Sequence, residues 1–500
     1  LNLHYFFFPL FIIIDFNKKL LNYIYIYMNI KLIHTLKKSI DILIYITFKI
    51  NKKDIEENLN LKLPKTIFNN FKGNYNDIKI QHFNDKIVII GGLGDEHKCS
   101  NENIMKITAN CFNTINNLNK KNICFFVINT NKKDKIESQI ISSILTLYNF
   151  DKYKTTHSNN PNNLYFYTKR RKFSTDINNF IIKGTNINII RNLINEPGNK
   201  LNPESYVKEI RSLSKNKKFS LKVLNHNDIK KLGMGGIESV GNGSKYKSSL
   251  VILKYTGNKK NKKNIVLVGK GVTFDAGGIN IKLRDFSDMK SDMTGSAIVL
   301  GVMKAVSEIG TNKNIVCLLP IVENMVDANA TRPGDVITMF NKKTVEVVDT
   351  DAEGRLIMAD AISYSKKFNP ETIINIATLT GAAENITNQK ASIILGNNID
   401  LINRFIKIGE NENEKLINLS IWRDFVDSTK SDIADYKNYD SRNSGGAIYA
   451  GAFLSNFLPK GDINWIHIDL GGDILMNNYF YYKKGSTGKG ARILMNYLLS

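Results

Sequence analysis

Three acidic side chains and one arginine occupy alternate positions in the sequence DTDAEGRL at residues 349–356. Three of the four residues at 345–348 are valines, and this apolar lead-in predicts a short strand. If the backbone stays extended, Asp351, Glu353 and Arg355 point to the same side. A helical apolar pattern follows, and such strand-to-helix junctions are where open α/β sheets usually bind ligands. Taken alone, however, this pattern favours a solvated turn with a surface salt bridge.

A second set of charged residues, further upstream, favours the chemical interpretation. A buried strand is predicted just before Lys270, which would emerge at the strand's C-terminal end. Asp275 follows in a glycine-rich turn, and Lys282 comes after it. Asp292 stands just before a small-residue helix expected at residues 294–306. Separate connections would therefore bring carboxylates and lysines to one region.

Four carboxylates cannot share a cavity unless their charge is cancelled, and here they are Asp275, Asp292, Asp351 and Glu353. Divalent cations are the simplest solution, because hard oxygen ligands suit magnesium, manganese or zinc and carboxylates readily bridge two ions. The sequence therefore predicts two divalent metal ions. Two dications would favour the neutral amine of a lysine, which would explain Lys270, whereas Lys282 and Arg355 would stay charged.

The order and spacing of several motifs resemble those of the leucyl aminopeptidase (cytosol aminopeptidase) family, peptidase family M17, from about residue 185 onward. Two of these motifs are specific: GKGVTFDAGG at residues 269–278 and DTDAEGRL at residues 349–356. The others are NEPGN at 195–199, LGMGGIESVGNGS at 232–244, MKSDM at 289–293, ATLTGA at 377–382, GGAIYAGAFL at 445–454 and WIHIDLGG at 465–472.

The resemblance implies a metallo-exopeptidase, a hydrolase that cleaves the N-terminal peptide bond of peptides. It implies that Asp275 and Glu353 are shared by both ions within a ligand set of Lys270, Asp275, Asp292, Asp351 and Glu353. One ion would anchor the free α-amine, and the pair would lower the pKa of a bridging water. Lys282 and Arg355 match the catalytic residues: Lys282 would stabilise the oxyanion, and Arg355 would hold a bicarbonate ion that acts as general base.

The resemblance also implies substrate contacts at Met289, Thr378, Leu379, Gly381, Gly471 and Ile474. Such a lining is apolar and uncharged, so it favours leucine and other apolar residues. The preference should be broad, because one methylene is worth only about 1 to 3 kcal/mol in an apolar pocket.

The chain departs from the family pattern at Asp349, where Asn is usual, and at Lys489, where an apolar residue is common. The Asp349 carboxylate adds negative charge near the metal ions, which would either raise their affinity or disturb the hydrogen bonds around them. Neither departure removes a ligand.

The 500-residue length and the 42% hydrophobic content allow a substantial core, and the patterning predicts two α/β domains. Residues 29–157 should form the first, which the resemblance implies is a macro-like domain without chemistry of its own. Residues 158–184 should be a linker and the start of a connecting helix at 175–195, and residues 185–500 the catalytic domain, with a mixed sheet flanked by helices. The clearest elements are strands at 86–94, 122–129, 221–224, 249–254, 265–268, 315–320 and 372–377 and helices at 103–118 and 137–148.

Residues 1–28 are predicted to be a non-native extension or a leader. The apolar run at residues 5–14 contains Pro9 and is too short for a membrane span, so no membrane partner is expected. The run lacks the basic flank of a signal peptide. Met28 is therefore the preferred start, and an organellar leader is the alternative.

The net charge of +23 would suit a polyanion-binding protein, but the lysines are dispersed among abundant Asn, Ile and Tyr. We attribute this composition to an AT-rich coding bias, so nucleic acid is a possible but not favoured partner. The cysteines at 99, 111, 124 and 317 form no C-x-x-C pair, which predicts free thiols in a reducing compartment and a cytoplasmic location.

The histidines include no H-E-x-x-H motif, which argues against a thermolysin-like zinc protease. His467 lies on an apolar strand and is expected to be a hydrogen-bonded core residue more than a metal ligand. A DNA-binding accessory protein and an inactive structural homologue remain alternatives, although an inactive chain would be expected to lose ligands and none is lost here. The resemblance also implies peptide substrates and a homohexamer.

Overall fold

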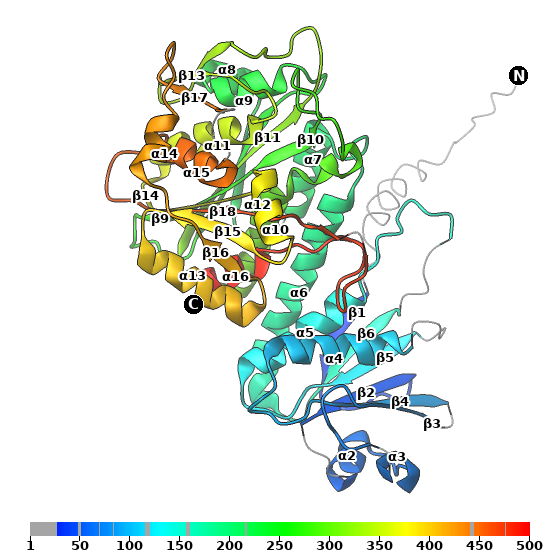
Figure 1. Cartoon of the computed structure of the whole chain (residues 1–500). Helices are drawn as coiled ribbons and strands as arrows, with labels where there is room; N and C mark the ends of the chain where they lie inside the picture. The colour runs from blue at the N-terminus through cyan, green and yellow to red at the C-terminus, as the bar shows by residue number, and fades with distance from the viewer. Residues whose placement is uncertain are drawn as a thin grey trace, which may run out of the picture.

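The chain folds into two α/β domains joined by the long helix α6 (Ser174–Asn195), with the N-terminal domain below and the larger domain above in Figure 1. This computed structural model describes residues 28–48, 52–69, 71–83, 85–115, 121–156, 161–215, 218–440, 445–475 and 477–500. The extension predicted at residues 1–28 thus lies, but for Met28, outside the described residues. Among the helices that are described, none combines the length and apolar character that a membrane crossing needs.

The N-terminal domain is a sheet with helices on both faces. Its strand order is β1-β6-β5-β2-β4-β3, and β3 alone in this order pairs antiparallel with its neighbour. Helices α4 and α5 cover one face, while α2 and α3 cover the other (Figure 1). The strands are β1 Asn29–Ile33, β2 Ile42–Thr47, β3 Ile78–Phe83, β4 Lys86–Gly92, β5 Asn122–Phe126 and β6 Asn163–Tyr167, and the helices are α2 Lys52–Leu59, α3 Lys65–Asn69, α4 Asn101–Asn113 and α5 Lys133–Thr146.

The prediction of a linker within residues 158–184 is wrong in part, because this segment contains strand β6. Residues Leu164 and Phe166 of this strand are fully buried, and β6 pairs with both β1 and β5. The alternation of Tyr and Phe in NLYFY was the missed signal. The helix predicted at 103–118 ends at Asn113, and residues 116–118 lie outside the described part of the chain. The residue ranges expected for the domains stay predictions.

A mixed sheet forms the centre of the larger domain. Its strand order is β16-β15-β18-β14-β9-β11-β8-β7, with β10 paired to the end of β11. The central strands β18, β14, β9 and β11 are parallel, while β8 and β15 run antiparallel to their inner neighbours. The strands are β7 Ser220–Leu224, β8 Ser249–Thr256, β9 Asn264–Gly269, β10 Gly271–Asp275, β11 Asn314–Asn324, β14 Pro370–Ala377, β15 Ser392–Gly396, β16 Leu416–Asn418 and β18 Asn464–Asp469.

Helices pack on both faces of this sheet, which confirms the predicted layering. One face carries α6, α10 and α16 and the other carries α9, α11 and α15. The helices are α7 Pro203–Leu213, α8 His226–Leu232, α9 Gly235–Gly241, α10 Thr294–Ile309, α11 Glu353–Tyr364, α12 Gly381–Thr387, α13 Ile399–Glu412, α14 Arg423–Ser428, α15 Gly446–Ser455 and α16 Ala491–Leu499, with 3-10 turns η1 Arg171–Phe173, η2 Phe286–Ser291 and η3 Ser365–Phe368. Short strands outside the main sheet are β12 Val336–Thr338, β13 Thr344–Glu346, β17 Tyr436–Lys437, β19 Ile474–Leu475 and β20 Gly485–Ser486.

The two domains share apolar packing along α6. Met105 of α4 and Leu145 of α5 belong to the same buried cluster as Ile190 of α6 and Ile298 of α10. Gly184 lies inside α6, which continues through it without a break. A Cβ at this position would stand 2.8 Å from the Ile144 side chain of α5. The glycine therefore permits the close approach of α5 and α6.

The strand predicted at residues 345–348 is only partly present. β13 ends at Glu346, a turn follows, and α11 begins at Glu353. Asp351, Glu353 and Arg355 therefore do not share the face of an extended strand. They are brought together by a turn and the first turn of a helix.

Replacing the buried Arg492 with Met should destabilise the fold. Arg492 Nε lies 3.2 Å from Glu414 Oε1, and the two side chains are 4% and 3% exposed. The Arg492→Met variant leaves a buried carboxylate without its guanidinium partner, so the free energy of unfolding in urea should fall by about 3 to 5 kcal/mol. The matched control is Arg423→Met, whose exposed pair with Asp427 is screened by solvent, so its loss should change the free energy of unfolding far less. Equal decreases in the free energy of unfolding of the two variants would contradict a stabilising role for the buried Arg492–Glu414 pair.

Candidate metal centre

The carboxyl ends of parallel strands at one edge of the large sheet carry the predicted charged residues. Lys270 follows β9, and Asp275 is the last residue of β10, which pairs with β11. The Lys270 side chain is buried, and its Nζ lies 2.8 Å from both Asp292 Oδ2 and Glu353 Oε1. Lys270 also donates a hydrogen bond of 3.1 Å to the carbonyl oxygen of Thr378. The strand ends thus position this lysine between two carboxylates.

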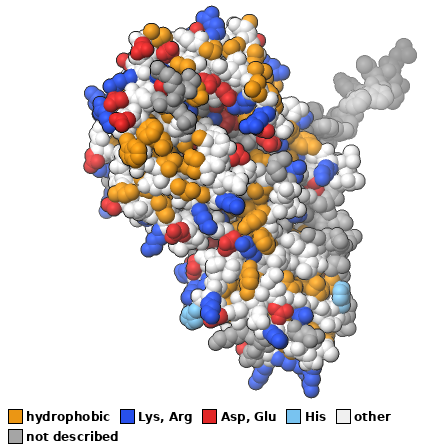
Figure 2. Space-filling model, viewed as in Figure 1, with side chains coloured by type: hydrophobic (Ala, Val, Ile, Leu, Met, Phe, Trp, Pro, Cys, Tyr) orange, Lys and Arg blue, Asp and Glu red, His pale blue; other side chains and the backbone are white. Residues whose placement is uncertain are grey.

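A second lysine contacts the other two carboxylates. Lys282 Nζ lies 2.8 Å from Asp275 Oδ2, and it donates a short hydrogen bond to Asp351 Oδ1. Ligand atoms of Asp275, Asp351 and Glu353 all lie within 4.8 Å of one another. Asp292 is outside this triad and meets the centre through Lys270. On the face shown in Figure 2, acidic side chains gather in a hollow of the larger domain.

Helix α11 presents Glu353 to the centre from its first turn, where the helix dipole favours a negative charge. The adjacent Gly354 packs against Lys270, because a Cβ at Gly354 would stand 2.5 Å from Lys270 Cε. Further along α11, the buried Asp360 accepts backbone hydrogen bonds from Ile237 and Phe340. These bonds fix the helix against α9 and the β12–β13 connection.

The crowding of like charges shows in the acid–base behaviour of the cluster. Burial and the carboxylates of Asp275 and Glu353 raise the pKa of Asp351 to about 7. Burial also raises the pKa of Asp275 and, more strongly, that of Asp292. For Lys270, burial acts to lower the pKa, but the surrounding carboxylates outweigh it and the pKa is raised. The cluster therefore has more negative charge than its two lysines cancel.

The donor set fits divalent metal ions. Glu353 Oε1 and Asp292 Oδ2 are buried, and neither accepts a well-directed hydrogen bond within the described part of the chain, although Lys270 is 2.8 Å from each. Unsatisfied carboxylate oxygens are hard ligands for such cations. A dication beside Lys270 would oppose the rise in its pKa and favour the neutral amine.

Arg355 lies in the first turn of α11 and is buried. Its Nη1 donates to the Asn438 carbonyl at 2.8 Å, and its guanidinium lies 5.7 Å from the centre of the Tyr449 ring. The Nε atom is buried and has no hydrogen-bond partner among the described residues. Glu353 also acts electrostatically on this arginine. The arrangement leaves one cationic donor available close to the acidic triad.

Several predicted substrate residues lie beside the charged centre. Thr378 Oγ1 donates to Asp292 Oδ1 at 2.9 Å, and Asp292 N donates to the Met289 carbonyl. Leu379 follows Thr378, and its backbone N–H donates to Asp469 Oδ1 at 3.0 Å. Thr378 therefore contacts the centre through Asp292, whereas Met289 meets only the Asp292 backbone and Leu379 is the next residue along the chain from Thr378.

The remaining predicted substrate positions differ in the space around them. No heavy atom lies within 4 Å of where a Cβ would stand at Gly381, the first residue of α12. At Gly471 a Cβ would stand 2.1 Å from Thr387 Oγ1, so this glycine is packed against α12. Ile474 in β19 is half-buried against the large core. Gly381 is thus the one of these three with room for a neighbouring ligand side chain.

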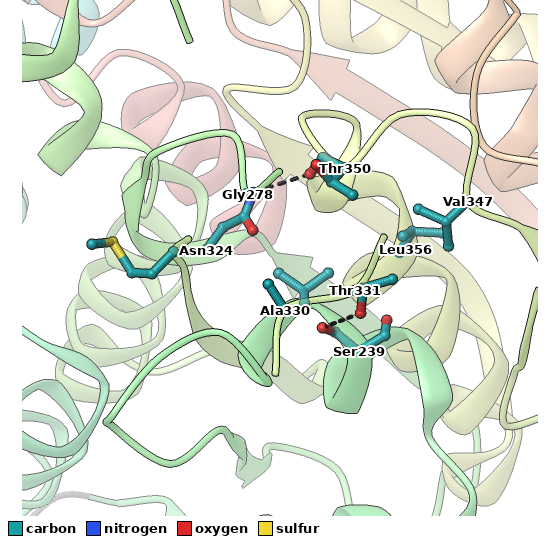
Figure 3. A pocket seen from close by; sticks show the side chains of 10 residues that line it. Ser239, Gly278, Asn324, Ala330, Thr331, Val347, Thr350 and Leu356 are labelled. Atoms are coloured by element: carbon teal, nitrogen blue, oxygen red, sulfur yellow. Dashed lines mark hydrogen bonds between the residues drawn. The ribbon is translucent and has the colours of Figure 1, made fainter. Parts of the chain in front are cut away.

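A small pocket adjoins the centre and is drawn in Figure 3. Gly278, Asn324, Thr350 and Leu356 are part of its lining. It has room for about one water molecule, which is far too little for an amino-acid side chain. The pocket is therefore part of the structure that surrounds the centre, and it is not a substrate-binding site.

Three buried residues that hold the functional loops were not predicted from the sequence. Asn438 accepts from the backbone N–H groups of Val348 and Asp349 and donates to the carbonyls of Asp349 and Ala352. Asp469 accepts from the N–H groups of Leu379 and Thr380 and from the Thr380 hydroxyl. Asn324 donates to Asp275. Asp469 and Asn324 each end an apolar strand run, which was the available signal.

The structure also shows where three other features considered in the sequence lie: Asp349, His467 and the cysteines. The Asp349 carboxylate accepts a hydrogen bond of 2.8 Å from the Asp351 backbone N–H, so the unusual acid braces the turn that carries Asp351. His467 is fully buried and its Nδ1 contacts the Asn375 side chain, as expected for a core histidine. All four cysteines are free and buried, as predicted.

Comparisons with known proteins place the chain among aminopeptidases. Models of the cytosol aminopeptidase family match the chain at residues 188–495 for the catalytic domain and 68–157 for the N-terminal domain. The probable cytosol aminopeptidase of Rickettsia bellii (strain OSU 85-389) is 35% identical over 459 residues, 87% of this chain and 91% of that protein. That of Thioalkalivibrio sulfidiphilus (strain HL-EbGR7) is 41% identical over 314 residues, 62% of each. The bottromycin maturation enzyme BotP in complex with Mn shares the fold, with a TM-score of 0.80, 23% identity and coverage of 92% of this chain and 98% of that one.

The buried His467 should make the fold less stable in mild acid. Burial lowers its pKa to about 3, whereas an imidazole in the unfolded chain takes up a proton near pH 6.5. As pH falls from 6.5 toward 3, the unfolded state binds the proton and the folded state does not, so the free energy of unfolding falls. In chelator, urea titrations of His467→Gln should show a weaker pH dependence than the wild type, by up to about 1.4 kcal/mol per pH unit. His97→Gln, at an exposed position, is the control and should parallel the wild type, and a parallel slope for His467→Gln would contradict the assignment.

Proposed function

The chain belongs to the cytosol aminopeptidase family, and from this premise we propose that it releases N-terminal leucine and other apolar residues from peptides at a pair of divalent metal ions. Family membership makes it an aminopeptidase, a hydrolase of the metallo-exopeptidase class. The proposal adds the number of ions, the leucine preference and the role of each residue. The observation that carries it is the meeting of Asp275, Asp351 and Glu353 within 4.8 Å beside two lysines.

The proposed ligands are the residues around this triad: Lys270, Asp275, Asp292, Asp351 and Glu353. Manganese or zinc bound there would polarise the scissile carbonyl and lower the pKa of a bound water. Asp275 and Glu353 are the best placed to be shared, because both belong to the triad and are buried, whereas the third member, Asp351, is partly exposed.

Lys282 and Arg355 have distinct proposed roles. Lys282 is bound on one side by Asp275 and Asp351 and keeps a raised pKa, because their carboxylates outweigh the effect of its burial. Its ammonium group can therefore stabilise negative charge that develops on the carbonyl oxygen. Arg355, with its free Nε, would hold a bicarbonate ion that accepts a proton from the attacking water.

The substrate's first side chain is proposed to lie near Met289, Thr378, Leu379 and Gly381, with Gly471 and Ile474 behind them. This lining contains no charged side chain and thus suits an apolar residue. The tight packing of Gly471 against α12 supports an indirect role, in which it sets the position of the helix that Gly381 begins.

The proposal also covers assembly and location. A homohexamer, which the sequence resemblance implies, would give about six times the 56.7 kDa chain mass in sedimentation analysis. A cytoplasmic location is proposed as well. Nucleic-acid binding is not favoured, because Lys and Arg are interspersed with acidic side chains on the face shown in Figure 2.

Loss of a carboxylate should abolish aminopeptidase activity. With Leu-amide and added Mn²⁺ or Zn²⁺, Asp351→Ala and Glu353→Ala should each lower kcat/KM by more than the roughly 100-fold expected when only a residue outside the ligand set is lost. Chelation should remove the wild-type activity, and Mn²⁺ should restore it. Asp285→Ala, an exposed acid on the loop after Lys282, is the matched control and should retain activity. Full activity in the Asp351 or Glu353 variant would refute the proposal.

Adding a side chain at Gly381 should change substrate preference. The open space around this position means that Gly381→Leu can be accommodated without moving the core. Its side chain should occupy part of the pocket, so kcat/KM for Leu-amide should fall roughly 10-fold relative to Ala-amide. Equal effects on both substrates would place Gly381 outside the pocket.

A further inference from the structure

We propose that Asn324 is a positioning residue that, together with Thr350, clamps the loops carrying Asp275 and Asp351 at the spacing required for metal binding. This inference rests on the proposed function, because it concerns the same centre.

Asn324 is placed between the two loops by the sheet. It is the last residue of β11, it is 4% exposed, and the register of β10 with β11 pairs it with Asp275. Its Nδ2 donates to Asp275 Oδ1 at 2.8 Å and to the Thr350 carbonyl at 3.0 Å. Both N–H bonds of one amide are therefore used, one on each loop (Figure 3 shows the bond to Thr350).

The bond from Asn324 orients the Asp275 carboxylate. Oδ1 accepts from Asn324 and from the Gly277 backbone N–H at 3.0 Å. The other oxygen, Oδ2, is the one that contacts Lys282 in the centre. The two oxygens thus have separate roles. Oδ1 is held by hydrogen bonds from the protein, and Oδ2 faces the proposed metal centre.

Thr350 closes the clamp from the side of Asp351. Its Oγ1 donates to the Gly277 carbonyl at 2.6 Å and accepts from Asn280 N at 2.8 Å. Its backbone N–H donates to Asn280 Oδ1 at 3.0 Å. The loop after Asp275 is therefore bonded to the residue directly before Asp351.

The two loops are in close contact at Gly278. At Gly278 a Cβ would stand 2.9 Å from Asn324 Oδ1 and 3.0 Å from Thr350 Oγ1. Gly278 also has a φ of +66°, which disfavours other residues. The loops therefore cannot approach or separate without breaking the bonds of Asn324 and Thr350.

Charge explains why a neutral amide suits this position. Asp275 and Asp351 are both acidic and have carboxylate oxygens within 4.8 Å of each other, so their charges repel. A lysine at position 324 would bind both loops but would cancel charge that the metal ions need. An amide donates to both loops and leaves the negative charge in place. Partners that orient metal ligands typically contribute 10- to 100-fold in metal affinity.

The first test compares two buried asparagines in two parallel strands of the same sheet, β11 and β14. Asn324→Ala should raise the Kd for Mn²⁺, measured calorimetrically on the purified, metal-depleted full chain, by roughly 10- to 100-fold. Asn375→Ala is the matched control, because Asn375 is fully buried in β14 and bonds to Trp465 and His467 instead. It should lower the melting temperature without changing the Kd. An unchanged Mn²⁺ Kd in folded Asn324→Ala would overturn the inference.

A second pair of variants decides the matter if Asn324→Ala does not fold. Thr350→Val loses the hydroxyl bonds and should weaken Mn²⁺ binding, whereas Thr350→Ser keeps the hydroxyl and should restore it. Identical Kd values for Thr350→Val and the wild type would overturn the inference. Failure of the proposed function gives a different result, because Asp275→Ala would then bind Mn²⁺ as the wild type does.

Discussion

Mutual repulsion among buried carboxylates is the constraint on which the rest of this structure depends. Asp275, Asp351 and Glu353 meet within 4.8 Å, and Asp292 joins them through Lys270. Such a cluster would separate in a pliable protein, because hydration of each acid is cheaper than its burial beside the others. It persists here because each acid is attached to a rigid element and because lysine ammonium groups lie between the acids. The remaining negative charge is what makes the site suited to cations.

The fold supplies that rigidity from several directions. Parallel strands end at one edge of the sheet and deliver Lys270 and Asp275, and the buried start of α11 delivers Glu353. Polar residues of the sheet then hold the turns between these elements, as Asn438 holds residues 348–352 and Asp469 holds residues 379–380. The groups that hold these turns are uncharged or fully hydrogen-bonded, so they add little negative charge to the centre.

Much of the centre could be predicted from sequence because its residues stand in short motifs at strand ends. The supporting residues could not, since Asn324 and Asn438 act across 49 and 83 to 90 residues of chain, and no local pattern reports such a contact. The errors also have physical causes. A short apolar run at residues 345–348 gave a strand signal that the following turn cut short, and the Asn-rich flanks of β6 hid a buried strand. The periodicity of apolar residues predicts which side chains are buried, and both segments are too short for that pattern to distinguish a strand from a turn or a linker.

The shared packing along α6 has an evolutionary consequence. Side chains of α4 and α5 complete the core beneath the catalytic sheet, so the N-terminal domain is not a module that could be lost or exchanged freely. A descendant without it would expose an apolar surface on α6 and α10 and would have to repack or cover that surface at once. Gene fusion or domain shuffling at this boundary is therefore disfavoured, and the two halves are expected to have diverged together as one cooperative unit.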